Sequence, residues 1–182
     1  RWLYFAERTG PWSYNAKFPM WQVYRFDRET GETSVVTNAS GSAMRPALSP
    51  DGSTIVYVSN MTGNWDIYVR GLGGGDANQI TETPGRESHP RWSPDGRWIL
   101  FESNRGGDFQ LYTIPVGGGE ARALTRISTE AAQGVWSPDG KQVAFVSSVF
   151  PEFSEKPFAE SDAANRERQK KRDDSRSAEH TS

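Results

Sequence analysis

The hydrophobic and polar positions of this chain repeat with a period of 44 residues. The clearest marker is the tetrapeptide Ser-Pro-Asp-Gly, which occurs at 49–52, 93–96 and 137–140. After each copy comes a short run of β-branched and aromatic residues, at 55–59, 99–103 and 143–147. A pattern that keeps one period over three copies predicts repeated structural units.

Each copy predicts four short β-strands. The first strand ends just before Ser-Pro-Asp-Gly, and the second is the apolar run that follows it. The third contains Ile67 or Leu111, and the fourth ends at Thr81 or Thr125. In the tetrapeptide, proline presets the second turn position, aspartate tolerates the third, and glycine supplies a left-handed residue. We therefore expect Asp51, Asp95 and Asp139 to bind turn backbone and not to serve as acids or ligands.

Four strands in each period of about 40–45 residues indicate a β-propeller blade. The predicted fold class is all-β, a partial β-propeller of antiparallel blades. Two blades are complete, at 45–81 and 89–125, and partial blades lie at 2–37 and 134–148. A closed propeller has about 4–8 blades, so we expect that this chain cannot close one alone. Adjacent blades should bury the equivalent aromatic and leucine positions between them: Leu48, Tyr57, Trp92, Phe101, Trp136 and Phe145.

The composition changes after the last predicted strand. Residues 149–182 contain 15 charged residues out of 34, and the last aromatic residue is Phe158. We expect 149–174 to be a charged, helical insertion, with Ser161 as its N-cap and little tertiary contact from about residue 159. Residues 175–182 resemble a translated adapter sequence, and the chain has no initiator Met, so we expect a gene fragment with a non-native tail.

Charge and composition argue against several classes of partner and functional site. The net charge of −2 gives no electrostatic reason to expect nucleic acid as a partner. No apolar run approaches the roughly 20 residues that a membrane span needs. There is no cysteine, and the two histidines, His89 and His180, make a zinc site improbable. We predict no catalytic residue, metal or cofactor in this chain, because it has no Gly-x-Ser-x-Gly nucleophile elbow.

One surface is a candidate for binding. The loops after the two complete second strands should lie together on one propeller face. There they would either contact a substrate or partner or form only a solvated rim. Its candidate residues are Asn60, Asn64, Asn104, Arg105 and Asp108. His89 precedes a first strand, and its repeat equivalents are Arg45 and Gln133, so we expect a structural role for it.

The repeats resemble TolB-like propeller blades. Trp-Ser-Pro-Asp-Gly, then Ile-Leu-Phe-Glu-Ser-Asn-Arg, then Leu-Tyr-Thr-Ile-Pro-Val-Gly-Gly-Gly carry this resemblance over 45–147. From Leu124 on, Leu-Thr-Arg-Ile-Ser-Thr-Glu-Ala and Val-Phe-Pro-Glu-Phe-Ser look like bacterial prolyl oligopeptidase-family serine peptidases. In that family a charged insertion interrupts a blade, and a C-terminal α/β-hydrolase domain carries the catalytic triad. Residues 12–19 and 38–52 look more like propellers fused to amidohydrolases.

These resemblances leave three functional hypotheses. The first is a non-catalytic propeller that gates and positions peptide substrates for a hydrolase domain outside this chain. The second is a TolB-type propeller that binds protein partners, and the third is a propeller beside an amidohydrolase. The sequence does not distinguish a bacterial cytoplasmic location from a periplasmic or secreted one.

Overall fold

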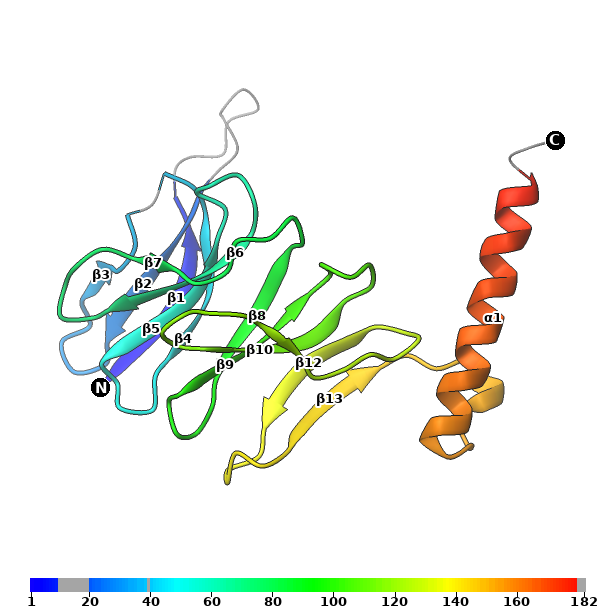
Figure 1. Cartoon of the computed structure of the whole chain (residues 1–182). Coiled ribbons are helices and arrows are strands. Elements are labelled where there is room, and N and C mark those ends of the chain that lie inside the picture. Colours follow the sequence, from blue (N-terminus) through cyan, green and yellow to red (C-terminus); the bar gives the residue numbers. More distant parts are fainter. Residues whose placement is uncertain (10–19, 39, 180–182) are drawn as a thin grey trace.

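The computed structural model describes residues 1–9, 20–38 and 40–179, with side chains omitted at 173 and 175–179. Within these residues, four antiparallel sheets follow one another along the chain, and a helix stands beyond the last (Figure 1). The first sheet contains β1 (Trp2–Arg8), β2 (Trp21–Asp27) and β3 (Thr33–Val35). The segment 12–19, which carries part of the amidohydrolase resemblance, lies outside the described residues.

The second and third sheets are the two complete blades. The second contains β4 (Ala43–Leu48), β5 (Thr54–Ser59), β6 (Asp66–Gly71) and β7 (Asn78–Gln79). The third contains β8 (Glu87–Trp92), β9 (Trp98–Ser103), β10 (Gln110–Pro115) and β11 (Arg122–Ala123). The fourth has β12 (Ala131–Trp136) and β13 (Val143–Ser147). Strand order within each complete sheet follows the chain, as the repeat predicts.

The Ser-Pro-Asp-Gly turns have the predicted geometry. Gly52, Gly96 and Gly140 adopt positive φ of 73°, 70° and 69°. The aspartate of each turn accepts the serine hydroxyl of the same tetrapeptide and the backbone N–H two residues later. The prediction that these aspartates serve the turn backbone is confirmed. Each serine oxygen also accepts an N–H at the start of the next strand or, in the third copy, one residue before it.

The first strands share a bulge that side-chain identity does not reveal. Arg45, His89 and Gln133 occupy one repeat position and all have positive φ, at 54°, 49° and 55°. The strand register shifts at this point in all three sheets. Non-glycine residues rarely adopt a positive φ. Because Arg, His and Gln all adopt it at the same repeat position, the bulge in the strand imposes this conformation, and the side chain does not.

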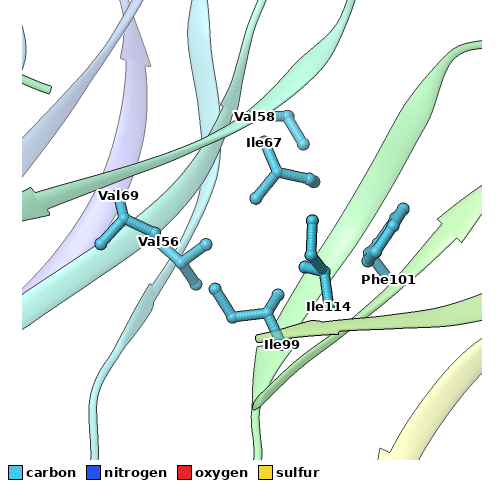
Figure 2. Close-up of a cluster of buried hydrophobic side chains, with 7 residues drawn as sticks. All are labelled: Val56, Val58, Ile67, Val69, Ile99, Phe101 and Ile114. Atoms are coloured by element: carbon cyan, nitrogen blue, oxygen red, sulfur yellow. The ribbon is translucent and has the colours of Figure 1, made fainter. Parts of the chain in front are cut away.

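The sheets stack as blades around their first strands. β4 contacts β1 and β8, and β8 contacts β12, so the first strands of successive sheets lie side by side. The Trp92 indole N–H donates to the Ala47 carbonyl of the preceding sheet at 2.9 Å. Between the second and third sheets, a cluster of buried side chains fills the interface (Figure 2): Val56, Val58, Ile67, Val69, Ile99, Phe101 and Ile114.

The prediction that adjacent blades bury the equivalent aromatic and leucine side chains is correct at the interface of the two complete blades and wrong at Leu48 and Phe145. Tyr57 and Phe101 are 1% and 0% exposed, while Trp92 and Trp136 are half-buried. Leu48, however, is 40% exposed. The equivalent of Tyr57 and Phe101 in β13, Phe145, is 38% exposed, because the described residues place no further sheet against it.

The C-terminal segment forms a short 3₁₀ turn, η1 (Pro151–Phe153), and the helix α1 (Phe158–Glu179). The expectation of little tertiary contact from residue 159 is wrong for the first turns of α1. Asp162 accepts hydrogen bonds from the Ser128 N–H and hydroxyl, both at 2.7 Å. Ser161 is buried inside the helix and so is not its N-cap. The start of the helix is held by polar contacts, and the absence of apolar side chains therefore does not predict that it is free.

Candidate functional site

The candidate site lies at one end of the sheets, which we name the loop end. It comprises loops 60–65 and 104–109, connections 82–86 and 126–130, and the start of α1. Antiparallel pairing places these segments opposite the Ser-Pro-Asp-Gly turns, because each second strand runs from one end of its sheet to the other. Backbone bonds from Glu87 N–H to the Trp65 carbonyl and from Ala131 N–H to the Phe109 carbonyl join neighbouring segments.

The three predicted asparagines hold the loop end together. Asn60 and Asn104 occupy one repeat position, and their Oδ1 atoms accept the N–H groups of Ser42 and Arg86, each at 2.7 Å. Asn64 Nδ2 donates to two carbonyls of the connection to the next sheet. One end of each side-chain amide is therefore engaged within the protein. Their role in binding a partner stays a prediction.

Two glycines allow the close approach of these loops. A Cβ at Gly41 would lie 2.7 Å from backbone atoms of Met61, and one at Gly85 would lie 2.7 Å from backbone atoms of Arg105. Real Cβ atoms do not come so near to backbone, so any side chain at either glycine would push the loops apart.

Arg105 is largely internal, although the sequence placed it on the binding surface. Its Nη2 lies 2.9 Å from Glu87 Oε1, and its Nε donates to the Ser103 hydroxyl at 3.0 Å. The guanidinium also lies 4.7 Å from the ring centroid of Tyr112. The Arg105 side chain is 20% exposed and Glu87 is fully buried, so this pair is part of the contact between sheets.

Asp108 is the candidate residue most available to a partner. It is exposed and lines a pocket of about 370 Å³ between its loop, the 129–130 connection, residues 148–150 and α1. The lining combines acidic, basic and apolar groups: Asp108, Glu130, Arg172, Val149 and Phe150. Such a mixture can contact the charged and apolar groups of a polypeptide.

His89 forms a polar link that the sequence suggested only in part. Its Nδ1 lies 2.7 Å from Glu102 Oε2, and Glu102 Oε1 accepts the Gln133 N–H of the next sheet at 2.7 Å. The structural role predicted for His89 agrees with these contacts. Glu102 was missed, although it stands where the other copies have Val58 and Val146. A buried carboxyl at an otherwise apolar repeat position was the available signal.

Among the residues whose structure is described, no group of three or more histidine, aspartate or glutamate side chains is placed to hold a metal ion. The helices in that part of the chain include none long and apolar enough to cross a membrane.

The stacked four-stranded sheets define a β-propeller domain. A family model, TolB beta propeller domain, matches residues 12–169, and the chain belongs to this family. A comparison with curated protein sequences found no match.

Solved structures agree with this assignment. A putative TolB from Agrobacterium tumefaciens is 28% identical with a TM-score of 0.68, covering 80% of this chain and 50% of that one. TolB from Acinetobacter baumannii is 33% identical with a TM-score of 0.61, covering 74% and 33%. A puromycin-hydrolyzing peptidase of Mycobacterium tuberculosis has a TM-score of 0.62 at 14% identity, covering 83% and 28%, and shares the fold. The chain thus spans half or less of each of these proteins.

Proposed function

We propose that these blades are the non-catalytic propeller of a prolyl oligopeptidase-family serine peptidase, and that the loop end gates and positions peptide substrates. The observation that carries the proposal is the position of α1. It follows the second strand of a blade, β13, and docks at the loop end through Ser128 and Asp162. An insertion after a second strand brings a charged helix beside the loops that a substrate would contact.

The pocket at Asp108 supports this role. It opens between α1 and the blade loops, so a polypeptide approaching the loop end meets both. Burial raises the pKa of Asp162, but hydrogen bonds from Ser128 and Arg166 together hold it below its usual value. The carboxylate that anchors α1 therefore stays ionised at neutral pH, which keeps the helix docked.

A second candidate is a TolB-type propeller that binds protein partners. It is favoured by the identities of 28% and 33% to TolB structures, which exceed the 14% to the peptidase. Both candidates use the loop end for binding. They differ in whether an α/β-hydrolase domain accompanies the propeller.

The full-length protein tests the proposal. We expect it to cleave short peptides in a reaction blocked by serine reagents, and to leave folded proteins intact. Asp108→Arg at the loop end should raise KM for peptides, whereas the matched control Asp76→Arg, at the opposite end, should not. A full-length protein without a nucleophile elbow would reject the peptidase. In that case, loss of a protein partner in Asp108→Arg alone would favour the TolB-type function.

A further inference from the structure

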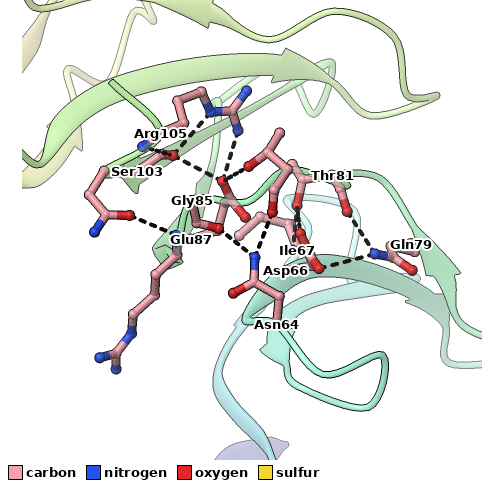
Figure 3. Close-up of polar contacts among 12 residues, drawn as sticks. Asn64, Asp66, Ile67, Gln79, Thr81, Gly85, Glu87, Ser103 and Arg105 are labelled. Atoms are coloured by element: carbon pink, nitrogen blue, oxygen red, sulfur yellow. Dashed lines mark hydrogen bonds and ion pairs between the residues drawn. The ribbon is translucent and has the colours of Figure 1, made fainter. Parts of the chain in front are cut away.

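A fully buried carboxyl group joins the two complete blades at the loop end. Glu87 begins β8, and its Oε1 accepts three hydrogen bonds, each of 2.9 Å (Figure 3). The donors are the hydroxyls of Thr83 and Ser103 and Nη2 of Arg105. Glu87 Oε2 is also buried, yet no donor reaches it among the residues whose structure is described. One oxygen of this carboxyl is thus fully used and the other lacks a donor.

A second buried carboxyl belongs to the same polar cluster (Figure 3). Asp66 begins β6 of the preceding sheet and is 2% exposed. Its two oxygens accept hydrogen bonds from the Thr81 hydroxyl at 3.2 Å and from Gln79 Nε2 at 3.1 Å. The side chains of Asp66 and Glu87 are themselves within hydrogen-bonding reach of each other. Two carboxyl groups in such contact are stable only if one of them carries a proton.

The charges around the pair lead to the same conclusion. The side chains that donate to the two carboxyls among the described residues are the Gln79 amide, the hydroxyls of Thr81, Thr83 and Ser103, and the Arg105 guanidinium. Arg105 is the one cation in this set, and it bonds Glu87. Two buried carboxylates beside one guanidinium would leave a net negative charge away from water. Burial, the largest cause, and the contact with Asp66 together raise the pKa of Glu87 to about 7, against the lowering effect of Ser103, Thr83 and Arg105.

We propose that Glu87 and Asp66 share one proton, and that this proton is a pH-sensitive latch between the second and third sheets. The proton lies on Glu87 Oε2 and is donated to the Asp66 carboxylate. Its removal leaves two negative charges in contact across the blade interface. The latch lies beside the bonds from Asn64 to the 82–86 connection, so its opening loosens the loop end. This device does not depend on which partner the loop end binds.

The direction of the pH effect follows from linkage. A carboxyl whose pKa is higher in the folded than in the unfolded protein makes the fold more stable when protonated. The contribution of Glu87 is therefore complete below its ordinary pKa of 4.5 and is lost as the pH rises through about 7. The contact between the two blades should weaken from mildly acidic to mildly alkaline conditions.

Thermal unfolding of the 182-residue chain between about pH 5 and about pH 9 tests the latch. In the parent chain, Tm should fall by several degrees across neutral pH. Glu87→Gln keeps the shape and a donor toward Asp66, so its Tm should lose this fall. In Asp66→Asn the fall should move to lower pH, because Glu87 then ionises beside Arg105 alone. Glu120→Gln, on an exposed turn, is the control and should keep the parental profile.

Infrared spectroscopy gives a readout that does not depend on the stability of a variant. At mildly acidic pH the parent chain should show a protonated-carboxyl C=O band that disappears as the pH rises through about 7. Glu87→Gln should lack the band. A parent chain without it, or a Tm profile that is the same in the parent and Glu87→Gln, would overturn the proposal.

Discussion

The interface between the two complete blades differs from its two neighbours at three repeat positions. These positions hold the charged residues Asp66, Glu87 and Arg105 at the central interface. One period earlier they hold Gln22, Ala43 and Met61, and one period later Gln110, Ala131 and Val149. At these three positions the same backbone thus holds a charged cluster in one interface and neutral side chains in the other two.

The neutral interfaces show what stacking requires. Gln22 Nε2 donates to the Gly41 carbonyl, and Gln110 Nε2 donates to the carbonyls of Ile127 and Thr129. Ala43 and Ala131 are fully buried. At these positions, an amide that bonds the connecting segment and a buried alanine therefore take the place of the charged cluster. The charged cluster adds dependence on pH and on a counterion, since buried ion pairs contribute little net stability over neutral packing.

The largest effect should separate the central interface from the end of the stack. Phe101→Ala should cost about 3–5 kcal/mol of unfolding free energy, because it empties a fully buried position between two sheets. Phe145→Ala, one period later, should cost far less, because that ring is already 38% exposed. Urea denaturation of both variants measures the difference. Equal losses would mean that β13 is covered in solution.

Removing one member of the charged cluster of Asp66, Glu87 and Arg105 should lower the unfolding free energy strongly, whereas replacing all three residues should lower it little. Arg105→Met leaves two buried carboxyls without their cation and should cost about 3 kcal/mol at alkaline pH. Asp66→Gln, Glu87→Ala and Arg105→Met together copy the first interface. This triple variant should fold with a stability within about 1–2 kcal/mol of the parent, by the same urea measurement. A triple variant no better than Arg105→Met would show that the cluster itself holds the blades.

The sequence predicts the part of this molecule that repeats. The 44-residue register locates every strand of the two complete blades to within a few residues, because turn residues and alternating apolar side chains set strand ends locally. The left-handed glycines and the roles of the turn aspartates also follow from local chemistry. The exposed Leu48 shows the limit, since whether an apolar position is covered depends on the neighbouring sheet.

Departures from the repeat carry the information that periodicity omits. Glu87 replaces alanine and Glu102 replaces valine in otherwise matching copies, and both are buried with specific partners. Asn104 and Arg105 were predicted as binding residues from their loop position. In the structure, Asn104 accepts a hydrogen bond from the Arg86 N–H, and Arg105 pairs with Glu87. Which side chains a loop contacts depends on the adjacent blade, and this cannot be derived from one copy alone. The docking of α1 escaped prediction because it uses polar contacts.

A smaller loss of stability is expected at the interface between the third and fourth sheets, where α1 makes a polar contact beside Val149. Asn165 is 1% exposed, and its Oδ1 accepts the Phe150 N–H at 3.0 Å. Asn165→Ala leaves that N–H without its acceptor and should cost about 1–2 kcal/mol. Glu167→Gln, on the exposed face of α1, leaves this hydrogen bond in place and is the control. Hydrogen exchange at the Phe150 amide should accelerate in the alanine variant alone, and unchanged protection there would show that α1 does not dock in solution.

The smallest effect should be common to all the blades, because the turns are shared where the interfaces are not. Gly52, Gly96 and Gly140 have positive φ, and a Cβ there meets either open space or ordinary contact with a proline ring. Alanine at each should cost roughly 1 kcal/mol, which is the backbone penalty for a left-handed L-residue. Gly73→Ala is the control: its φ is not left-handed and a Cβ there meets nothing within 4 Å, so stability should be unchanged or slightly raised. Urea denaturation measures the three losses. Three unequal losses would mean that the turns contribute to blade stacking as well as to the hairpins. The differences between interfaces could then no longer be assigned to the positions of Asp66, Glu87 and Arg105 alone.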